Sequence, residues 1–172
     1  MRSHRSTLGY LATATIAATL ATATPAAATD TANQRFVIMA HGTTMTSRRL
    51  TATGPISGVG TDTLLDHNLN PDGTFTDIDR FDLPLGQVIL NDTYTATVRT
   101  DPTTCVSKIT VTGTYHIVSG TGHYTGATGT GTFTATGTLV AHRDPSGSCL
   151  DTTPPTAYEE IVHGTGSTTL PR

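Results

Sequence analysis

The chain has 172 residues and a formal net charge of −3, with 13% charged residues, 5% aromatic residues and no tryptophan. This acidic balance and the lack of a basic patch argue against binding to a phosphate backbone, so we expect no nucleic-acid partner. About 40 threonines, β-branched residues that suit solvated strand faces, indicate an all-β protein.

Residues 1–28 have the composition of a secretory signal peptide. Two arginines open the chain, an uncharged run rich in Ala, Leu and Thr follows over residues 8–24, and three alanines end at Ala28. We expect cleavage near Ala28, which leaves one secreted domain over residues 29–172. That domain has 8 basic and 13 acidic residues, a formal charge of −5. The apolar run is too short and too weakly apolar for a membrane span.

Alternation of apolar and polar residues predicts strands along most of the mature chain. A short polar arm is expected over residues 29–34 and a connection over 47–55. Strands are expected over residues 35–44, 56–66, 74–83, 87–100, 105–119, 127–143 and 157–165. Seven or eight antiparallel strands without a helix predict a single small β-barrel, with a β-sandwich as the alternative. Glycines inside the strands favour the barrel because they permit sharp coiling.

The longest pattern is a hairpin that turns near His123. Paired residues must point to the same face of a sheet, which limits the possible registers. The favoured register places each bulky side chain over a glycine: Tyr115 with Gly131, Gly113 with Phe133, and Ile109 with Gly137.

The same register predicts rows of threonines on the outer face. The pairs are Thr110 with Thr136, Thr112 with Thr134, and Thr114 with Thr132, beside Thr93, Thr95 and Thr97 of the preceding strand. A regular array of methyl and hydroxyl groups suggests a surface that orders water or docks on a partner. The plainer interpretation is a solvated strand face.

Two cysteines, Cys105 and Cys149, remain in a chain that we expect to be exported, and an even count predicts one disulfide. The hairpin register places Cys105 opposite Ala141, from which the loop over residues 144–148 can fold back. No histidine lies near either cysteine in sequence, which makes a metal site or a catalytic thiol the weaker interpretation.

The segment SGTGHYTGATG resembles the glycine-rich hairpin of the allene oxide cyclase and dirigent-like barrels. The matching residues are Gly120, Thr121, Gly122, Tyr124, Ala127 and Gly129, and Ser119 stands where the family has a glycine. The resemblance covers at most residues 56–143. It implies an eight-stranded barrel that binds hydrophobic small molecules without a cofactor. The cyclases use an acidic residue inside the barrel, but residues 35–44 contain no carboxylate to match it.

The acidic stretch with Asp77, Asp79 and Asp82 has two interpretations. Calcium binding is disfavoured because the spacing and glycine turn of a calcium loop are missing. We expect these acids to be solvated or paired with Arg80. No histidine spacing typical of a metal site occurs, so we predict no metal and no cofactor.

Glu159 and Glu160 are adjacent and therefore point to opposite faces of the last strand. One of them could lie inside a barrel, where burial would suit it to acid–base work. His163 shares a face with Glu159. These three residues are the weak catalytic candidates, and a rim position without chemistry is the plainer interpretation.

The leading hypothesis is a secreted barrel that binds a hydrophobic small molecule near Tyr94, Tyr115 and Phe133. The alternatives are a cofactor-free isomerase or cyclase, and a surface-interaction protein that uses the threonine array. Binding is favoured over catalysis because no catalytic motif is present. The oligomeric state is left open.

Overall fold

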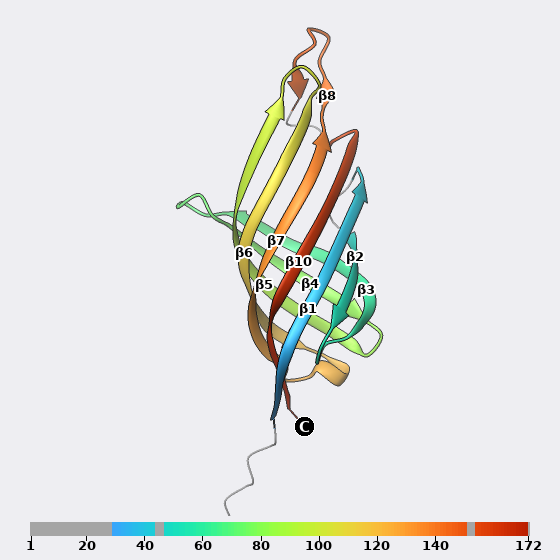
Figure 1. The fold of residues 1–172 in the computed structure, drawn as a ribbon, viewed down its shortest axis with the longest axis vertical. Helices are drawn as coiled ribbons and strands as arrows, with labels where there is room; N and C mark the ends of the chain where they lie inside the picture. Colours follow the sequence, from blue (N-terminus) through green and yellow to red (C-terminus); the bar gives the residue numbers. More distant parts are fainter. Residues whose placement is uncertain (1–28, 44–46, 151–153, 172) are drawn as a thin grey trace, which may run out of the picture.

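The computed structural model describes residues 29–43, 47–150 and 154–171, in which eight antiparallel strands close into a barrel (Figure 1). The barrel strands are β1 Thr29–Gly42, β2 Ser47–Thr53, β3 Gly58–Leu69, β4 Phe75–Leu83, β5 Gly86–Asp101, β6 Val106–Gly120, β7 Thr128–Val140 and β10 Ala157–Pro171. A 3-10 turn, η1, spans Gly122–Tyr124, and a small second sheet pairs β8 (His142–Arg143) with β9 (Cys149–Leu150). The all-β barrel prediction is confirmed. The predicted signal peptide lies outside the described residues.

The strand order is β1-β10-β7-β6-β5-β4-β3-β2, so β1 to β7 pair mostly with their neighbours in sequence. β10 enters between β7 and β1 and closes the barrel. In Figure 1, β5, β6 and β7 extend toward the β8–β9 sheet, and the hairpin that joins β3 to β4 projects sideways.

The two ends of the barrel differ. At one end, here called the closed end, η1 places the fully buried Tyr124 ring inside, and its hydroxyl donates to the Ser57 carbonyl across the barrel at 3.0 Å. The opposite end, here called the mouth, is where β1 ends and β2 begins. Apolar side chains fill the closed end, whereas ionisable side chains gather at the mouth.

The predicted hairpin register is confirmed, with Tyr115 opposite Gly131 and Gly113 opposite Phe133. A methyl group on Gly131 would lie 2.5 Å from Cε1 of Tyr115, which leaves no room for any side chain there. The Phe36 ring similarly occupies the space over Gly164. Rings over glycines therefore fill the interior.

Two expectations for the N-terminal part were wrong. Residues 29–34 are not a mobile arm but the first half of β1, which pairs with β10 along its length. Gln34 is buried there, where its amide donates to the Ile56 carbonyl at 2.9 Å and accepts from the Ile56 N–H at 3.0 Å. The expected connection over residues 47–55 contains β2, which joins β1 to β3.

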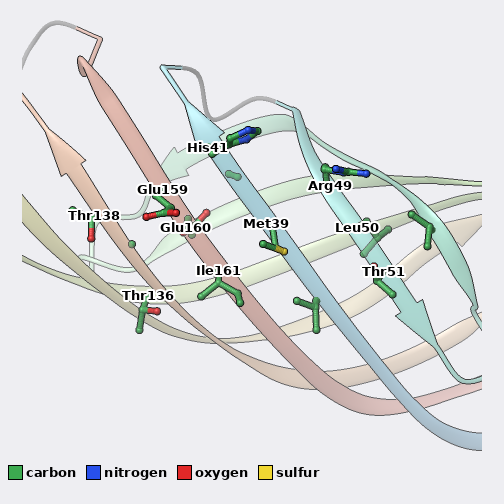
Figure 2. A pocket seen from close by; sticks show the side chains of 14 residues that line it. Met39, His41, Arg49, Leu50, Thr51, Thr136, Thr138, Glu159, Glu160 and Ile161 are labelled. Carbon is green, nitrogen blue, oxygen red and sulfur yellow. The ribbon is translucent and has the colours of Figure 1, made fainter.

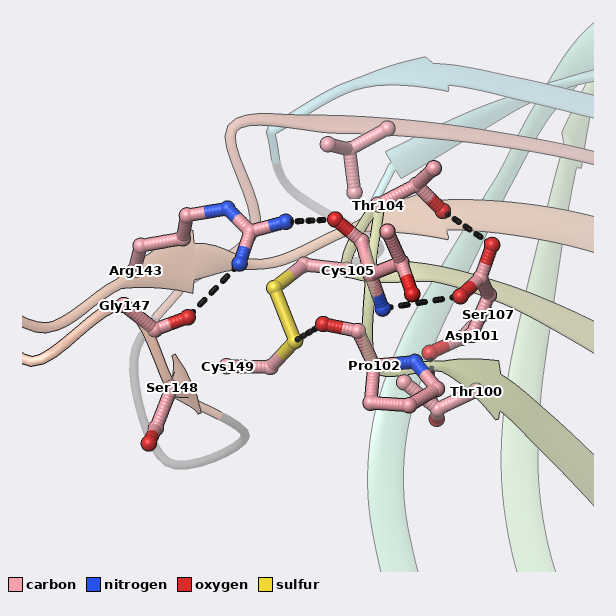
Figure 3. Close-up of a disulfide and its surroundings, with 12 residues drawn as sticks. Thr100, Asp101, Pro102, Thr104, Cys105, Ser107, Arg143, Gly147, Ser148 and Cys149 are labelled. Atoms are coloured by element: carbon pink, nitrogen blue, oxygen red, sulfur yellow. Dashed lines mark hydrogen bonds between the residues drawn. A yellow bond between two sulfur atoms is a disulfide. The ribbon is translucent and has the colours of Figure 1, made fainter.

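The predicted disulfide between Cys105 and Cys149 is present, with 5.4 Å between the two Cα atoms (Figure 3). It ties the start of β6 to β9. Arg143 strengthens this corner by donating to the Gly147 carbonyl at 2.6 Å and to the Thr103 carbonyl. Closure of so long a loop adds about 2–4 kcal/mol to stability by restricting the unfolded chain.

The predicted threonine rows also form. β5, β6 and β7 align three threonines each across their outer faces: Thr93, Thr114 and Thr132; Thr95, Thr112 and Thr134; Thr97, Thr110 and Thr136. All nine are exposed.

Candidate functional site

Two hollows in the described structure differ in their chemistry. The larger, about 630 Å³, is an open groove on the outer surface of β1, β2, β7 and β10 (Figure 2). Outward side chains line it, among them Met39, Ile161, Thr136, Arg49 and Glu159. The smaller, about 70 Å³, lies inside the barrel near the mouth and is surrounded by ionisable groups. The inner cavity is therefore the candidate site.

Six ionisable side chains meet at the mouth because alternation turns each of them inward. Arg48 comes from β2, Asp62 from β3, Asp77 and Asp79 from β4, Asp92 from β5 and Glu160 from β10. All except Asp62 line the cavity. Five acids thus share the interior with one permanently charged cation.

Arg48 is the centre of this group. Its Nη2 atom lies 2.6 Å from Oδ2 of Asp62 and 2.8 Å from Oδ1 of Asp79, and its Nη1 atom lies 3.8 Å from Glu160. Burial by itself lowers the pKa of Arg48, but the charges of Asp62, Asp79 and Glu160 outweigh it and raise the pKa well above its ordinary value. Arg48 is therefore permanently charged, and its one guanidinium group is shared among three carboxyl groups.

The remaining acids at the mouth belong to a second network. Asp77 accepts a hydrogen bond from the Tyr94 hydroxyl at 3.1 Å, and its other oxygen lies 2.7 Å from Nδ1 of His67. The His67 ring is half exposed, stacks on Phe75 at 5.3 Å and borders the solvent. A carboxylate that holds one ring nitrogen of a histidine leaves the other free to accept a proton.

Asp92 faces both networks from β5, opposite Asp77 in the register. Burial raises the pKa of Asp92 to about 8, and the negative charges of Asp79, Asp62 and Asp77 add to this effect. Asp92 makes no ion pair with Arg48, so the effect of burial on its pKa is not fully offset. It is therefore a neutral carboxylic acid at pH 7.

Asp62 and Asp79 show the same conflict between burial and charge. Burial raises the pKa of Asp62 to about 8 although Arg48 lowers it. Burial also raises the pKa of Asp79, while the charge of Arg48 and hydrogen bonds from Arg48 and Asp92 act in the opposite direction. One arginine cannot keep this many buried carboxyl groups ionised, so protons remain on some of them.

Several polar atoms of the cluster have no hydrogen-bond partner within the described residues. They are Nε of Arg48, both carboxyl oxygens of Asp62, and Oδ1 of Asp92. Asp62 Oδ2 nevertheless lies 2.6 Å from Nη2 of Arg48, whose charge partly compensates it. Unsatisfied buried atoms beside a cavity indicate a place for water or for a polar group of a ligand.

The residues predicted from sequence fall in different places. Glu160 points into the barrel and hydrogen-bonds Tyr158, whereas Glu159 and His163 are exposed on the outer face. Tyr94 and Phe133 line the cavity, with ring centroids 6.1 Å apart. Tyr115 lies deeper, against Phe36, and does not line the cavity. The structure thus brings Glu160, Tyr94 and Phe133 together.

The interpretation of Asp77 and Asp79 as solvated acids was wrong, because both are buried inside the barrel. Only Asp82 is paired with Arg80, at 2.9 Å on the outer face. The sequence contained a signal for this. Asp77, Asp79 and Phe81 are two residues apart along one strand and therefore point to the same face, and Phe81 is buried.

Sequence reasoning missed Arg48, Asp62, His67 and Asp92 altogether. Asp92 stands between Leu90 and Tyr94 on the inward face of β5, so its parity indicated burial. Arg48 had no such signal, because its strand was taken for a connection.

No group of three or more His, Cys, Asp or Glu side chains within the described ranges has the geometry to hold a metal ion. The same part of the chain contains no helix long and apolar enough to cross a membrane. Comparison with known proteins yields no match to a protein family, to a curated protein or to a solved structure. The resemblance of residues 119–129 to the allene oxide cyclase and dirigent-like barrels stays a prediction.

Proposed function

We propose that this protein binds a small molecule at the mouth of the barrel and catalyses a cofactor-free isomerisation by acid–base chemistry. The observation that supports it most is the coexistence of Asp92, a neutral acid at pH 7, with a histidine–aspartate pair on the neighbouring strands. Such chemistry requires a proton donor and a proton acceptor that are both within reach of the substrate.

In the proposed reaction, the carbonyl oxygen of the substrate enters the cavity and accepts the proton of Asp92. His67, oriented by Asp77 through Nδ1, takes a proton from the adjacent carbon at the mouth. His67 then returns its proton to a different carbon of the resulting enediol or dienol, and an enol hydroxyl returns a proton to Asp92 as the carbonyl forms again. The product is an isomer, and no oxidant or co-substrate is consumed. Arg48 holds Asp79 beside Asp92 and limits the charge that accumulates there.

Secretion forms part of this proposal. The disulfide between Cys105 and Cys149 fits an oxidising compartment, and the composition of residues 1–28 fits export with cleavage near Ala28. An enzyme that works without a cofactor is suited to act outside the cell, because no cofactor has to be supplied there.

Binding of a hydrophobic small molecule without catalysis is the second candidate. The apolar side chains of Ala96, Val98 and Ile109 face inward beyond the cavity, and Val98 is 58% exposed there. The cavity of about 70 Å³ admits a few waters, whereas ligand pockets enclose roughly 300–1,000 Å³. A hydrophobic ligand would therefore rest on the strand extensions above the mouth.

Exchange of carbon-bound hydrogen tests the proposed function without a known substrate. A panel of small aryl ketones and amino ketones is incubated with the purified protein in D2O and followed by proton NMR. We expect enzyme-dependent deuterium uptake at the carbon next to the carbonyl, reduced at least about a hundredfold in Asp92→Asn. Glu159→Gln, on the outer face, should match the wild type. Equal uptake in Asp92→Asn, or none above buffer across the panel, would contradict the proposal.

A further inference from the structure

The charges at the mouth are unbalanced. Arg48 lies within 4 Å of Asp62, Asp79 and Glu160, and it is 3.8 Å from the last of these. Beside Asp77 lies the half-exposed ring of His67, which the proposed reaction uses as a proton acceptor. Glu160 and Asp77 both line the cavity, and each lacks a close, permanently charged cation of its own.

The polar atoms that face the cavity favour a hydrogen-bond donor. Asp77 and Glu160 line the cavity and present carboxyl oxygens to it. Oδ1 of Asp92, another lining residue, has no hydrogen-bond partner within the described residues. A group that fills this space can therefore donate hydrogen bonds to the oxygens of Asp77 and Glu160. An ammonium group has three donors and no acceptor.

Aromatic rings form one wall of the same space. Tyr94 and Phe133 line the cavity and meet edge to face, with ring centroids 6.1 Å apart. Phe75 does not line the cavity but stacks on Tyr94 at 5.4 Å. Tyr94 lies close enough to Asp77 and Glu160 for both to raise the pKa of its hydroxyl, after the larger effect of burial. Aromatic faces attract organic cations, most strongly where water is excluded.

We propose that the mouth of the barrel is selective for organic cations, with the ammonium group between Asp77 and Glu160 and its apolar body against Tyr94 and Phe133. This inference rests on the proposed function, because it names the substrate class of the same site. The cavity accommodates a head group of that size but not an aryl body, which stays at the mouth. A carboxylate in the same position meets Asp77 and Glu160 as like charges and is excluded.

Three ligands with the same phenylethyl body and different head groups test this selectivity: 2-phenylethylammonium, 2-phenylethanol and 3-phenylpropionate, each titrated into the purified protein by calorimetry and NMR. The ammonium should bind at least about tenfold more tightly than the alcohol, and the carboxylate should not bind. The preference should weaken with added salt. Equal affinities for the ammonium and the alcohol would overturn the proposal, as would tighter binding of the carboxylate.

Adjacent glutamates provide a matched pair of variants. Glu160→Gln should reduce the affinity for the ammonium at least about tenfold, whereas Glu159→Gln removes the same charge from the outer face and should leave it unchanged. Tyr94→Leu should weaken ammonium binding more than alcohol binding, which keeps the proposal testable if Glu160→Gln folds poorly. Equal loss in the two glutamine variants would show that only the overall charge matters.

The outcomes also separate this inference from the proposed function. Deuterium uptake on neutral ketones without ammonium binding would refute cation selectivity and leave the acid–base function standing. Ammonium binding without uptake on any ketone would refute the acid–base function and leave a cation-binding site.

Discussion

The closed end and the mouth of the barrel are built from the same strands, in which side chains alternate between the inner and the outer face. The inward side chains are apolar at the closed end and ionisable at the mouth. Toward the closed end, inward positions carry Val88, Ile117 and Tyr124, which are nearly inaccessible to water. At the mouth, inward positions of neighbouring strands carry Arg48 and five acids. Burial of apolar side chains stabilises a fold, whereas burial of charges costs free energy unless they are paired. Under the proposed function, the closed end maintains the fold and the mouth supplies the acid–base groups.

The largest expected effect comes from removing a ring of the apolar packing, Phe36, which also forms part of the wall of the inner cavity. Phe36 packs edge to face on Phe81 and Tyr115, with centroids 5.3 and 5.2 Å away, and lies over Gly164. Phe36→Ala should leave a cavity and lower the free energy of unfolding by about 3–5 kcal/mol. Chemical denaturation at pH 6 measures this change. A loss below about 1 kcal/mol would mean that the rings do not carry the stability.

A substitution at the mouth should have a smaller effect and the opposite sign. The folded-state pKa of Asp92 is about 8, against 3.8 for the ordinary group, so the folded protein holds a proton that the unfolded chain releases between these values. Stability therefore falls as pH rises from about 4 to 8. Asp92→Asn should remove part of this dependence and stabilise the protein at pH 8 by about 2 kcal/mol.

Unfolding curves for the wild type and Asp92→Asn, recorded at pH 5 and at pH 8, check this prediction. The difference between the two proteins should be smaller at pH 5 than at pH 8, because only part of the range from about pH 4 to 8 has then been crossed. Destabilisation by Asp92→Asn at both pH values would mean that its carboxyl group contributes to the fold and not to a site.

The outer face should respond least to substitution. Thr112 and Thr134 are paired across β6 and β7 and are exposed. Thr112→Lys and Thr134→Lys together should change the unfolding free energy by less than about 1 kcal/mol. Growth of ice crystals and adhesion to surfaces, measured on both proteins, decide whether the array has a role. If both are unchanged, the threonines are only a solvated face.

The hairpin of β6 and β7 could be predicted from sequence because its information is local. Alternation fixes the faces, and the match of Tyr115 to Gly131 and of Phe133 to Gly113 fixes the register. The position of Cys105 then follows, and the disulfide with it. A pattern that repeats over a dozen residues on each arm leaves few other registers.

The charged cluster could not be predicted in the same way, because its members are distant in sequence. Asp79 is tolerable inside the barrel only because Arg48, 31 residues earlier, reaches it at 2.8 Å. The strand with Arg48 was not recognised, so the inward acids had no visible partner and were assigned to solvent. Parity indicates that Asp77, Asp79 and Phe81 share a face, but only the closed topology explains how acids are accommodated on it.

A carboxyl titration followed by carbon-13 NMR tests the central claim most directly, namely that the mouth holds a neutral acid at pH 7. In the wild type, aspartate carboxyl signals should titrate near pH 8, and one of them should be absent in Asp92→Asn. Glu159→Gln, the outer-face control, should leave these signals in place. If every aspartate carboxyl titrates below about pH 5, the mouth contains only ionised acids and the proposed acid–base function is wrong.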